Sequence, residues 1–292
     1  MRRYRPWFAA AVAAVLVLVP GTSYAAPPAP GGRILYLALD DAAGGGAKIQ
    51  SVRPTGHDVR DTGRTAFFGA SPDYSPDGSR IAYIDGFSFR TMASDGSDDR
   101  WLVDGGSGPA YPRWSPDGQS IVGEVGGDIW SVSKDGYAGG WSDLTGAHDS
   151  NDLVPSWAPN GHRFSTSTFN DLRIYSADGA TTLKIIPLPG AYRQAWNPKR
   201  NQLAVEALGD LWLVDISSGA IRRLTNTPNV QELSPVWSPD GRWLAYGRGS
   251  GTYNNDVPGL GVKPVIWLMD SNGGHRHSVG VAGMPSSWRA AG

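Results

Sequence analysis

The chain of 292 residues contains no cysteine. It therefore cannot form disulfides, and thiolate catalysis and cysteine-ligated metal sites are excluded. Lysine is scarce, with 5 lysines against 21 arginines, and no run of basic residues occurs. With a formal net charge of −1, the chain lacks the charge pattern of a protein that binds nucleic acid or an anionic membrane surface.

Long apolar runs are also lacking, apart from one at residues 8–19, which is too short to span a membrane comfortably. An arginine-rich start precedes this run, a Pro-Gly break follows it, and small residues then lead to Ala25. This pattern predicts a signal peptide over residues 1–25, cleaved near Ala25, and hence a secreted or extracytoplasmic protein. An uncleaved anchor is the alternative. Residues 26–32 are expected to form a short Pro/Gly linker.

Sequence motifs of known chemistry are missing as well. There is no Gly-x-Ser-x-Gly elbow, no His-Glu-x-x-His and no glycine-rich phosphate loop after a strand. The histidine pair in His275-Arg276-His277 lies just beyond a Gly-Gly turn, which is weak evidence for a metal site. We therefore assign no catalytic residue, no metal ligand and no cofactor from the sequence.

What the sequence does contain is a repeat in which an aromatic residue meets a turn. The six anchors are Tyr74-Ser75-Pro76-Asp77-Gly78, Trp114-Ser115-Pro116-Asp117-Gly118, Trp157-Ala158-Pro159-Asn160-Gly161, Trp196-Asn197-Pro198-Lys199, Trp237-Ser238-Pro239-Asp240-Gly241 and Trp288. The aromatic residues are 40, 43, 39, 41 and 51 positions apart. A period of about 40–45 residues is typical of a β-propeller blade with four short strands.

The chemistry of this repeat predicts a strand, a tight turn and a second strand. Proline presets the backbone for a type I turn, aspartate bonds its own backbone, and glycine takes the left-handed position that follows. Alternating segments such as Arg80-Ile81-Ala82-Tyr83-Ile84 come next, as expected for a strand. The aromatic residue should end the innermost strand, strand A, and pack between neighbouring blades.

A second repeat, in which an apolar pair closes on a glycine, predicts strand C and the turn to strand D. Its glycines are 40, 40, 43, 40 and 54 positions apart, at Gly56, Gly96, Gly136, Gly179, Gly219 and Gly273. The first set of strands B, C and D starts near Arg33 without a strand A, and the last strand A, at Trp288, has nothing after it. We therefore predict an all-β, six-bladed propeller over residues 33–292, with four antiparallel strands per blade. The C-terminal strand A should join the N-terminal strands B to D and close the ring.

The Trp-Ser-Pro-Asp-Gly repeats, followed by apolar strands, resemble the TolB-type propeller family, a WD40-like repeat fold. The resemblance covers roughly residues 33–292. It implies a protein-binding scaffold of the cell envelope. The same repeats also form the propeller domains of prolyl-oligopeptidase-like enzymes. TolB-type proteins carry a small α/β domain before the propeller, whereas in this chain the first blade is expected directly after the leader.

Strand direction sorts the loops onto two faces of the predicted disc. The tight A–B and C–D turns share one face, which we call the turn face. The D–A and B–C connections share the other, the variable-loop face, which includes a long insertion at residues 249–264. Function concentrates on variable loops held by a rigid scaffold. The candidate ligand-binding residues on this face are Phe67, Phe68, Tyr111, His148, Asp149, Asp152, Tyr192, Glu232, Tyr253, Asn255 and Asp256.

Asp152 and Glu232 each lie five residues before a tryptophan of the repeat, so we expect them near the mouth of the central channel. The sequence favours a secreted, non-catalytic binding or scaffold propeller that recognises a protein, peptide or cell-envelope polymer. We expect a monomer without nucleic-acid partners or stable membrane insertion. The alternative is a carbohydrate- or peptide-active enzyme, a lyase or hydrolase, that uses His148 and the nearby carboxylates. Each candidate could instead be an ordinary solvated loop residue.

Overall fold

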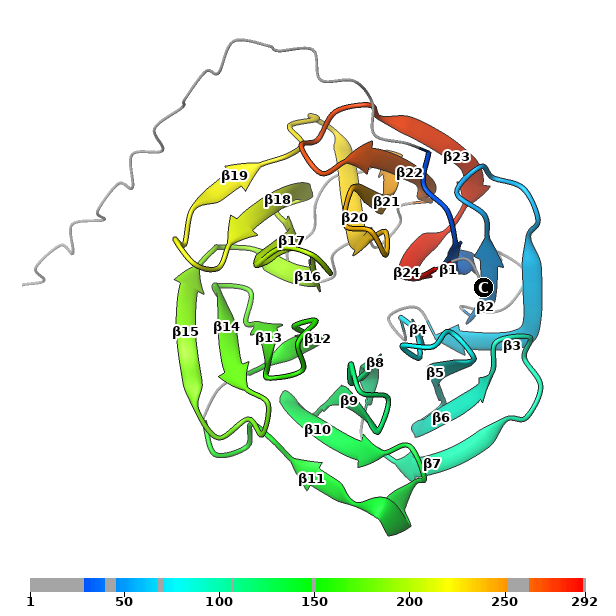
Figure 1. Ribbon diagram of the computed structural model, residues 1–292, viewed down its shortest axis with the longest axis vertical. Helices are drawn as coiled ribbons and strands as arrows, with labels where there is room; N and C mark the ends of the chain where they lie inside the picture. Colours follow the sequence, from blue (N-terminus) through cyan, green and yellow to red (C-terminus); the bar gives the residue numbers. More distant parts are fainter. Residues whose placement is uncertain are drawn as a thin grey trace, which may run out of the picture.

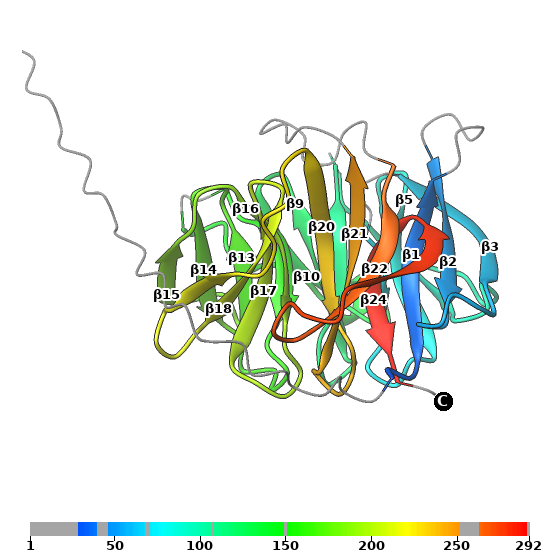
Figure 2. The same ribbon diagram turned by 90° about the horizontal axis from the view of Figure 1, so that it is seen from above.

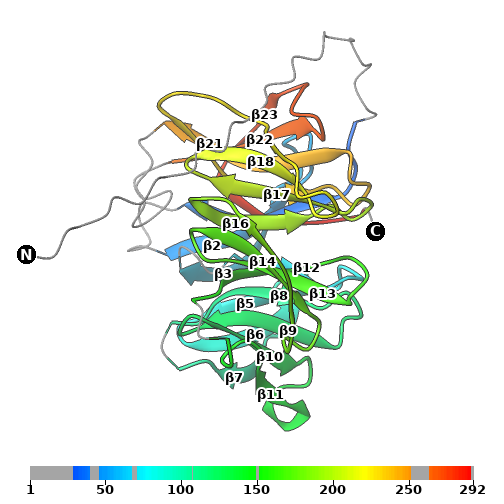
Figure 3. The ribbon, with the colours of Figure 1, turned by 90° about the vertical axis from the view of Figure 1, so that its left-hand side faces the viewer.

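The protein is a ring of six four-stranded sheets around a central axis, as Figure 1 shows for the computed structural model. The structure describes residues 29–39, 46–67, 71–106, 108–148, 151–250 and 263–290. Figures 2 and 3 show the ring edge-on as a disc, with the strands running across its thickness. The predicted signal peptide lies outside the described residues. The prediction of a six-bladed, all-β propeller is confirmed.

Each blade is an antiparallel sheet whose four strands follow one another from the axis outward. The first three blades are blade 1 with β24 (Met284–Arg289), β1 (Arg33–Leu39), β2 (Gly46–Val52) and β3 (Arg60–Phe67); blade 2 with β4 (Asp73–Tyr74), β5 (Arg80–Asp85), β6 (Ser88–Ala93) and β7 (Arg100–Asp104); and blade 3 with β8 (Ala110–Trp114), β9 (Ser120–Val125), β10 (Asp128–Ser133) and β11 (Trp141–Asp143). The other three are blade 4 with β12 (Leu153–Trp157), β13 (Arg163–Ser167), β14 (Asp171–Ser176) and β15 (Thr182–Pro187); blade 5 with β16 (Ala191–Trp196), β17 (Gln202–Ala207), β18 (Asp210–Asp215) and β19 (Ile221–Arg223); and blade 6 with β20 (Val230–Trp237), β21 (Trp243–Ser250), β22 (Val265–Asp270) and β23 (His277–Ala282). One 3-10 turn, η1 (Tyr137–Gly139), precedes β11.

The two ends of the chain share blade 1, as predicted. Strand β24 pairs antiparallel with β1, and Ile34 lies opposite Trp288. The Trp288 side chain is buried, and its indole Nε1 donates to the backbone oxygen of Gly31 at 3.0 Å. Figure 1 shows β24 and β1 side by side next to the C-terminus. Because no cysteine exists, this closure depends on non-covalent pairing alone.

The repeated turns have the geometry that their sequence predicts. In the first of them, Gly78 has φ 71° and its N–H donates to the oxygen of Ser75 at 2.8 Å. The Ser75 hydroxyl donates to Asp77 Oδ1 at 2.6 Å. Gly118, at the same place in blade 3, has φ 69°. Glycine adopts this left-handed conformation at little cost, which explains its place in the motif.

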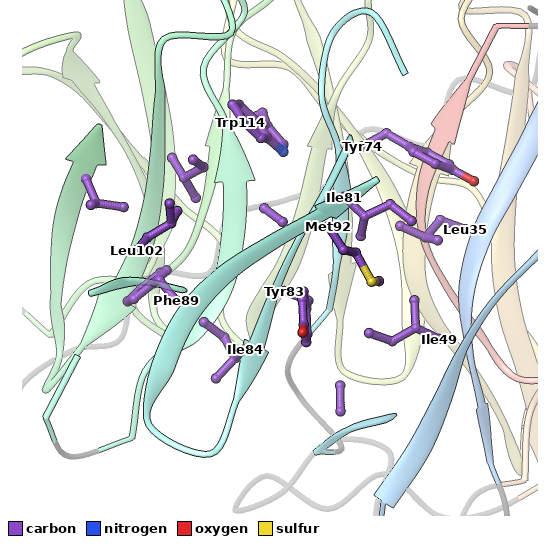
Figure 4. Close-up of a cluster of buried hydrophobic side chains, with 14 of the residues drawn as sticks. Leu35, Ile49, Tyr74, Ile81, Tyr83, Ile84, Phe89, Met92, Leu102 and Trp114 are labelled. Atoms are coloured by element: carbon purple, nitrogen blue, oxygen red, sulfur yellow. The ribbon is translucent and has the colours of Figure 1, made fainter. Parts of the chain in front are cut away.

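The core lies between the blades. Figure 4 shows one such cluster, where side chains of β5 and β6 such as Ile81 and Met92 lie among residues from the adjoining blades. The tryptophans of the repeat also reach the preceding blade. Trp196 Nε1 donates to the Ser165 hydroxyl of blade 4 at 3.0 Å, and Trp237 Nε1 donates to the Ala195 oxygen of blade 5 at 3.1 Å. These contacts confirm that the aromatic anchors join neighbouring blades.

Across the described part of the chain, no helix has the length and apolar character needed to traverse a bilayer.

Replacing the buried Trp288 by alanine should weaken the closure of the ring. We expect Trp288→Ala to lower the free energy of unfolding by about 3–5 kcal/mol, the usual cost of removing a buried tryptophan side chain. Trp101→Ala is the matched control, because Trp101 is 51% exposed on the outer strand β7, and it should cost less than about 1 kcal/mol. Urea denaturation of the two variants measures the difference. Equal losses would show that the β24 contact does not hold the ring.

Candidate functional site at the central channel

Six innermost strands surround a central channel. On the side of the turn face they enclose a cavity of about 250 Å³. The residue just before each aromatic anchor lines this cavity, at Asp73, Arg113, Ser156, Ala195, Val236 and Ser287. Three of these come from blades 1 to 3 and are charged or polar, whereas Ala195 and Val236, from blades 5 and 6, are apolar. The cavity is thus polar on one side and apolar on the other.

Asp73 and Arg113, the two charged groups of this cavity, are held in place by hydrogen bonds. Asp73 Oδ2 accepts the backbone N–H of Trp114 at 2.9 Å. Arg113 donates to the Ser71 backbone oxygen at 2.6 Å and to its hydroxyl at 2.9 Å. Burial raises the pKa of Asp73 and lowers the pKa of Arg113, since a charged form is disfavoured away from water.

Toward the variable-loop face, two predicted site residues meet across the channel. The hydroxyls of Tyr111 in blade 3 and Tyr192 in blade 5 are hydrogen-bonded, and their rings are edge-on with centroids 6.0 Å apart. Blades 3 and 5 are not neighbours, because blade 4 lies between them in the ring (Figure 1). The Arg193 guanidinium lies 4.7 Å from the centre of the Tyr192 ring and 5.6 Å from that of Tyr111. We call Tyr111, Tyr192 and Arg193 the tyrosine bridge.

A buried ion pair supports the tyrosine bridge. Arg193 Nη1 lies 3.5 Å from Oε2 of Glu206, and the two residues are 5% and 0% exposed. The same carboxylate oxygen accepts the backbone N–H of Ser234 from blade 6 at 2.8 Å. Burial raises the pKa of Glu206. Burial also opposes the charge of Arg193, but Tyr111 and Glu206 outweigh it, so the pKa of the guanidinium lies above its ordinary value.

His148 and Asp152 lie between blades 3 and 4, and a shared contact with Tyr175 links them. The His148 ring is 5.0 Å from the Tyr175 ring, and its Nε2 is 2.7 Å from the backbone oxygen of Gly179 in a C–D turn. Asp152 is 0% exposed and accepts the hydroxyls of Thr166 at 2.5 Å and Tyr175 at 2.9 Å. Both residues therefore contact blade 4 strands outside the innermost ring, and Asp152 is closed off from solvent.

Glu232 is likewise buried, at 1% exposure. Its Oε1 lies 3.4 Å from Nε of Arg248, whose guanidinium packs over the Trp267 ring at 4.7 Å. Burial raises the pKa of Glu232. The structure thus places this residue within blade 6, paired with its own cation.

Six predicted site residues remain. Phe67 ends strand β3. Five others lie outside the described residues, namely Phe68, Asp149, Tyr253, Asn255 and Asp256. Their part in a site stays a prediction.

Sequence reasoning missed Arg193, Glu206 and the related Glu124. A signal for the two glutamates was present as a shared Glu-x-x-Gly-Asp-Ile/Leu-Trp segment, at residues 124–130 and 206–212.

A proline two residues before the aromatic anchor was a further signal. The residue preceding this proline has a positive φ in four blades, at Ser71, Tyr111, Val154 and Ser234. This backbone bends strand A, and in blades 4 and 6 it directs an N–H toward a glutamate of the preceding blade.

Of these two glutamates, Glu124 has no cationic neighbour in the part of the chain that the structure describes. It lies on β9, is partly exposed, and accepts the backbone N–H of Val154. Its Oε2 is buried and has no hydrogen-bond partner among the described residues. Burial raises the pKa of Glu124 to about 7.

Comparison with solved structures relates this channel to known propellers. TolB from Acinetobacter baumannii superimposes with a TM-score of 0.69 and 18% identity, covering 91% of this chain and 68% of that one. A putative TolB from Agrobacterium tumefaciens gives a TM-score of 0.65 and 17% identity, covering 88% and 92%. The chain has a TolB-like propeller fold. Hydrazine synthase of Kuenenia stuttgartiensis shares part of it, with a TM-score of 0.55 and 16% identity over 71% of this chain and 64% of that one.

Sequence comparison is less informative about this TolB-like propeller. No family model matches the chain. A Bacillus subtilis protein described as the uncharacterized peptidase YuxL is 26% identical over 197 residues, which is 60% of this chain and 28% of that relative. The chain thus spans little more than a quarter of this curated relative.

Removing the cation from the buried Arg193–Glu206 pair should be costly. Arg193→Met leaves the Glu206 carboxylate buried without its partner, and we expect the free energy of unfolding to fall by about 3–5 kcal/mol at pH 8. Adding Glu206→Gln should recover a large part of this loss, because it removes the uncompensated charge. Arg242→Met is the control at an exposed arginine. Denaturant unfolding of the parent, the two single variants Arg193→Met and Glu206→Gln, the double variant and the control measures the coupling, and simple additivity of the two changes would contradict the ion pair.

The raised pKa of Glu124 makes stability depend on pH. The pKa of Glu124 is about 7 in the folded protein, against an ordinary value of 4.5. The protonated carboxyl therefore stabilises the folded state fully below about pH 4.5, and this stabilisation is lost as the pH rises through 7. In the parent, the free energy of unfolding should fall by about 2–3 kcal/mol between pH 5 and pH 8 because of this group, and we expect Glu124→Gln to abolish that fall. Asp85→Asn, at an exposed carboxyl on the same face, should leave the fall unchanged. An identical pH profile for Glu124→Gln and the parent would refute this assignment.

Proposed function

We propose that this TolB-like propeller is a non-catalytic binding or scaffold protein that recognises a protein or peptide on its variable-loop face. The observation that carries the proposal is the presence of large exposed apolar side chains at two of its B–C turns. Phe87, between β5 and β6, is 65% exposed, and Leu208, between β17 and β18, is 51% exposed. Large exposed apolar side chains on loops of one face are typical of surfaces that bind other proteins.

The backbone of these turns supports the same proposal. Leu208 has φ 54° and Phe169, in the B–C turn of blade 4, has φ 64°. A bulky residue in this left-handed region is strained by about 1–3 kcal/mol, and such strain persists mainly at functional sites. An apolar residue thus occupies the tip of each turn, although glycine or asparagine would adopt this backbone conformation at lower cost. Phe169 also stacks on Tyr192 of the tyrosine bridge, at 5.2 Å.

An extracytoplasmic location is part of the proposal. The predicted signal peptide over residues 1–25 and the fold shared with TolB support it. A cell-envelope polymer is a second possible ligand, but the exposed side chains at the turn tips are better suited to the apolar surface of a polypeptide.

The enzyme alternative receives no support from the geometry of its key residue. His148 is engaged with the Gly179 carbonyl oxygen and the Tyr175 ring. Asp152 is enclosed, as described above. The similarity to YuxL covers 28% of that protein, so the activity its name mentions is not a basis for assigning one to this chain.

A capture experiment tests the proposed function. The chain, tagged and crosslinked in envelope preparations of the producing cell, should retain a specific polypeptide. We expect Phe87→Ser combined with Leu208→Asn to reduce its capture at least about tenfold without lowering the melting temperature, since both side chains are exposed. Leu183→Ser with Ile185→Ser is the matched control, because both are 53% exposed but lie on the outer strand β15. Equal capture by both double variants would place the binding surface elsewhere.

A further inference from the structure

Blades 3 and 5 are near copies of each other around their B–C turns. The segments at residues 124–130 and 206–212 read Glu-Val-Gly-Gly-Asp-Ile-Trp and Glu-Ala-Leu-Gly-Asp-Leu-Trp. The backbone N–H of Ile129 donates to the Thr145 hydroxyl at 2.8 Å, and that of Leu211 donates to the Thr225 hydroxyl at 2.8 Å. The two glutamates that open these segments therefore occupy equivalent places.

Both glutamates hold the next blade in the same way. Glu206 accepts the N–H of Ser234, and Glu124 accepts the N–H of Val154. Ser234 and Val154 each have positive φ and each precede the proline of strand A. Each glutamate also keeps one buried carboxylate oxygen without a hydrogen-bond partner among the described residues, Oε1 in Glu206 and Oε2 in Glu124.

The two sites differ in their cation. In blade 5 the third residue before the tryptophan anchor is Arg193, and it pairs with Glu206. In blade 3 the corresponding residue is the uncharged Tyr111. Every lysine and arginine beyond residue 5 lies in the described part of the chain, and within that part none forms an ion pair with Glu124. The chain therefore supplies a guanidinium to one copy of the site and none to the other.

Access also differs between the two copies. The turn beside Glu206 begins with Leu208, whose side chain lies against Gly190. The turn beside Glu124 has Gly126 at this place, and among the described residues no atom apart from those of its chain neighbours lies within 4 Å of the position that a side chain would take there. Glu124 is partly exposed, whereas Glu206 is fully buried. A side chain from outside can thus approach Glu124 past Gly126, whereas Gly127 of the same turn packs against Asn151.

We propose that Glu124 is the anionic half of a subsite that takes an arginine side chain of a polypeptide bound on the variable-loop face. The arginine would complete in blade 3 the carboxylate–guanidinium pair that Arg193 and Glu206 form within blade 5. Tyr111, the neighbour of Glu124's strand partner Ala110, is itself buried and contacts the Arg193 guanidinium through its ring. This subsite rests on the proposed function, because it deepens the description of the same face.

A small probe tests the subsite without the partner. N-acetylarginine methylamide is titrated into the full-length protein carrying carboxyl-¹³C glutamate, and the pKa of the Glu124 carboxyl is followed by NMR. We expect saturating probe to lower this pKa by about one unit or more, since an adjacent opposite charge favours the ionised carboxylate. The lysine analogue should bind more weakly, because a guanidinium pairs with a carboxylate through two parallel bonds. No change up to about 50 mM arginine probe, a range that covers Kd values of roughly 10 mM, would overturn the subsite.

Two variants make the result specific. Glu124→Gln should abolish probe binding, followed here by amide chemical shifts because the reporter carboxyl is gone, and the uncharged Glu124→Met serves the same purpose if the glutamine variant does not fold. Asp85→Asn removes one exposed carboxylate from the same face and should leave binding unchanged. An equal loss of binding in Asp85→Asn would show a general charge effect and overturn the proposal.

The outcomes separate this inference from the proposed function. If the probe binds at Glu124 but no envelope polypeptide depends on Phe87 and Leu208, the subsite stands and the proposed function fails. If a polypeptide is captured through these two residues and Glu124→Gln retains it as well as the parent does, the subsite is wrong and the proposed function stands. Both hold if Glu124→Gln weakens that capture about tenfold or more.

Discussion

The contact between each strand A aromatic residue and the preceding blade is the interaction on which the rest of this structure depends. A single four-stranded blade cannot bury both of its faces, so its stability comes from the neighbours. The indoles of Trp196 and Trp237 reach into the preceding blade, and Trp288 is buried at the junction of the two chain ends. Because no disulfide is available, the channel keeps its shape only while this ring of contacts is complete. The geometry of every site on either face follows from that closure.

The glutamates of blades 3, 5 and 6 differ in whether they have a cationic partner. Arg193 and Glu206 neutralise each other in a fully buried pair, and Glu232 has Arg248. Glu124 is equivalent to Glu206 but has no such partner, and burial raises its pKa to about 7. A buried carboxyl without a cation is a cost to stability. Such a cost is expected where a ligand supplies the missing charge, and the open turn at Gly126 lies beside it.

The sequence predicted the fold well because its signals are local and repeated. The Pro-Asp-Gly turns, the glycines of the C–D turns and the aromatic anchors each specify a backbone conformation or a buried face, and their offset predicted the shared blade. The candidate site was predicted less well, because side-chain direction depends on bulges in strand A that spacing does not reveal. Tyr111 and Tyr192 lie on the variable-loop side and meet across the channel, as a ring of loops allows. Asp152 and Glu232 have the same spacing from their tryptophans, and both are buried within their blades, where Asp152 bonds Thr166 and Tyr175 and Glu232 pairs with Arg248. Arg193 and Glu206 were overlooked because each looks like an ordinary strand residue until both are placed in one channel.

The central claim is that a polypeptide binds the variable-loop face of a closed TolB-like propeller. Hydrogen–deuterium exchange of the full-length protein, with and without the polypeptide captured from the envelope, tests it most directly. We predict slower exchange in the B–C turns at residues 86–87, 169–170 and 208–209, with no change in the A–B turns at residues 76–78 and 116–118. Protection confined to the A–B turns would contradict this claim and would place the binding surface on the turn face.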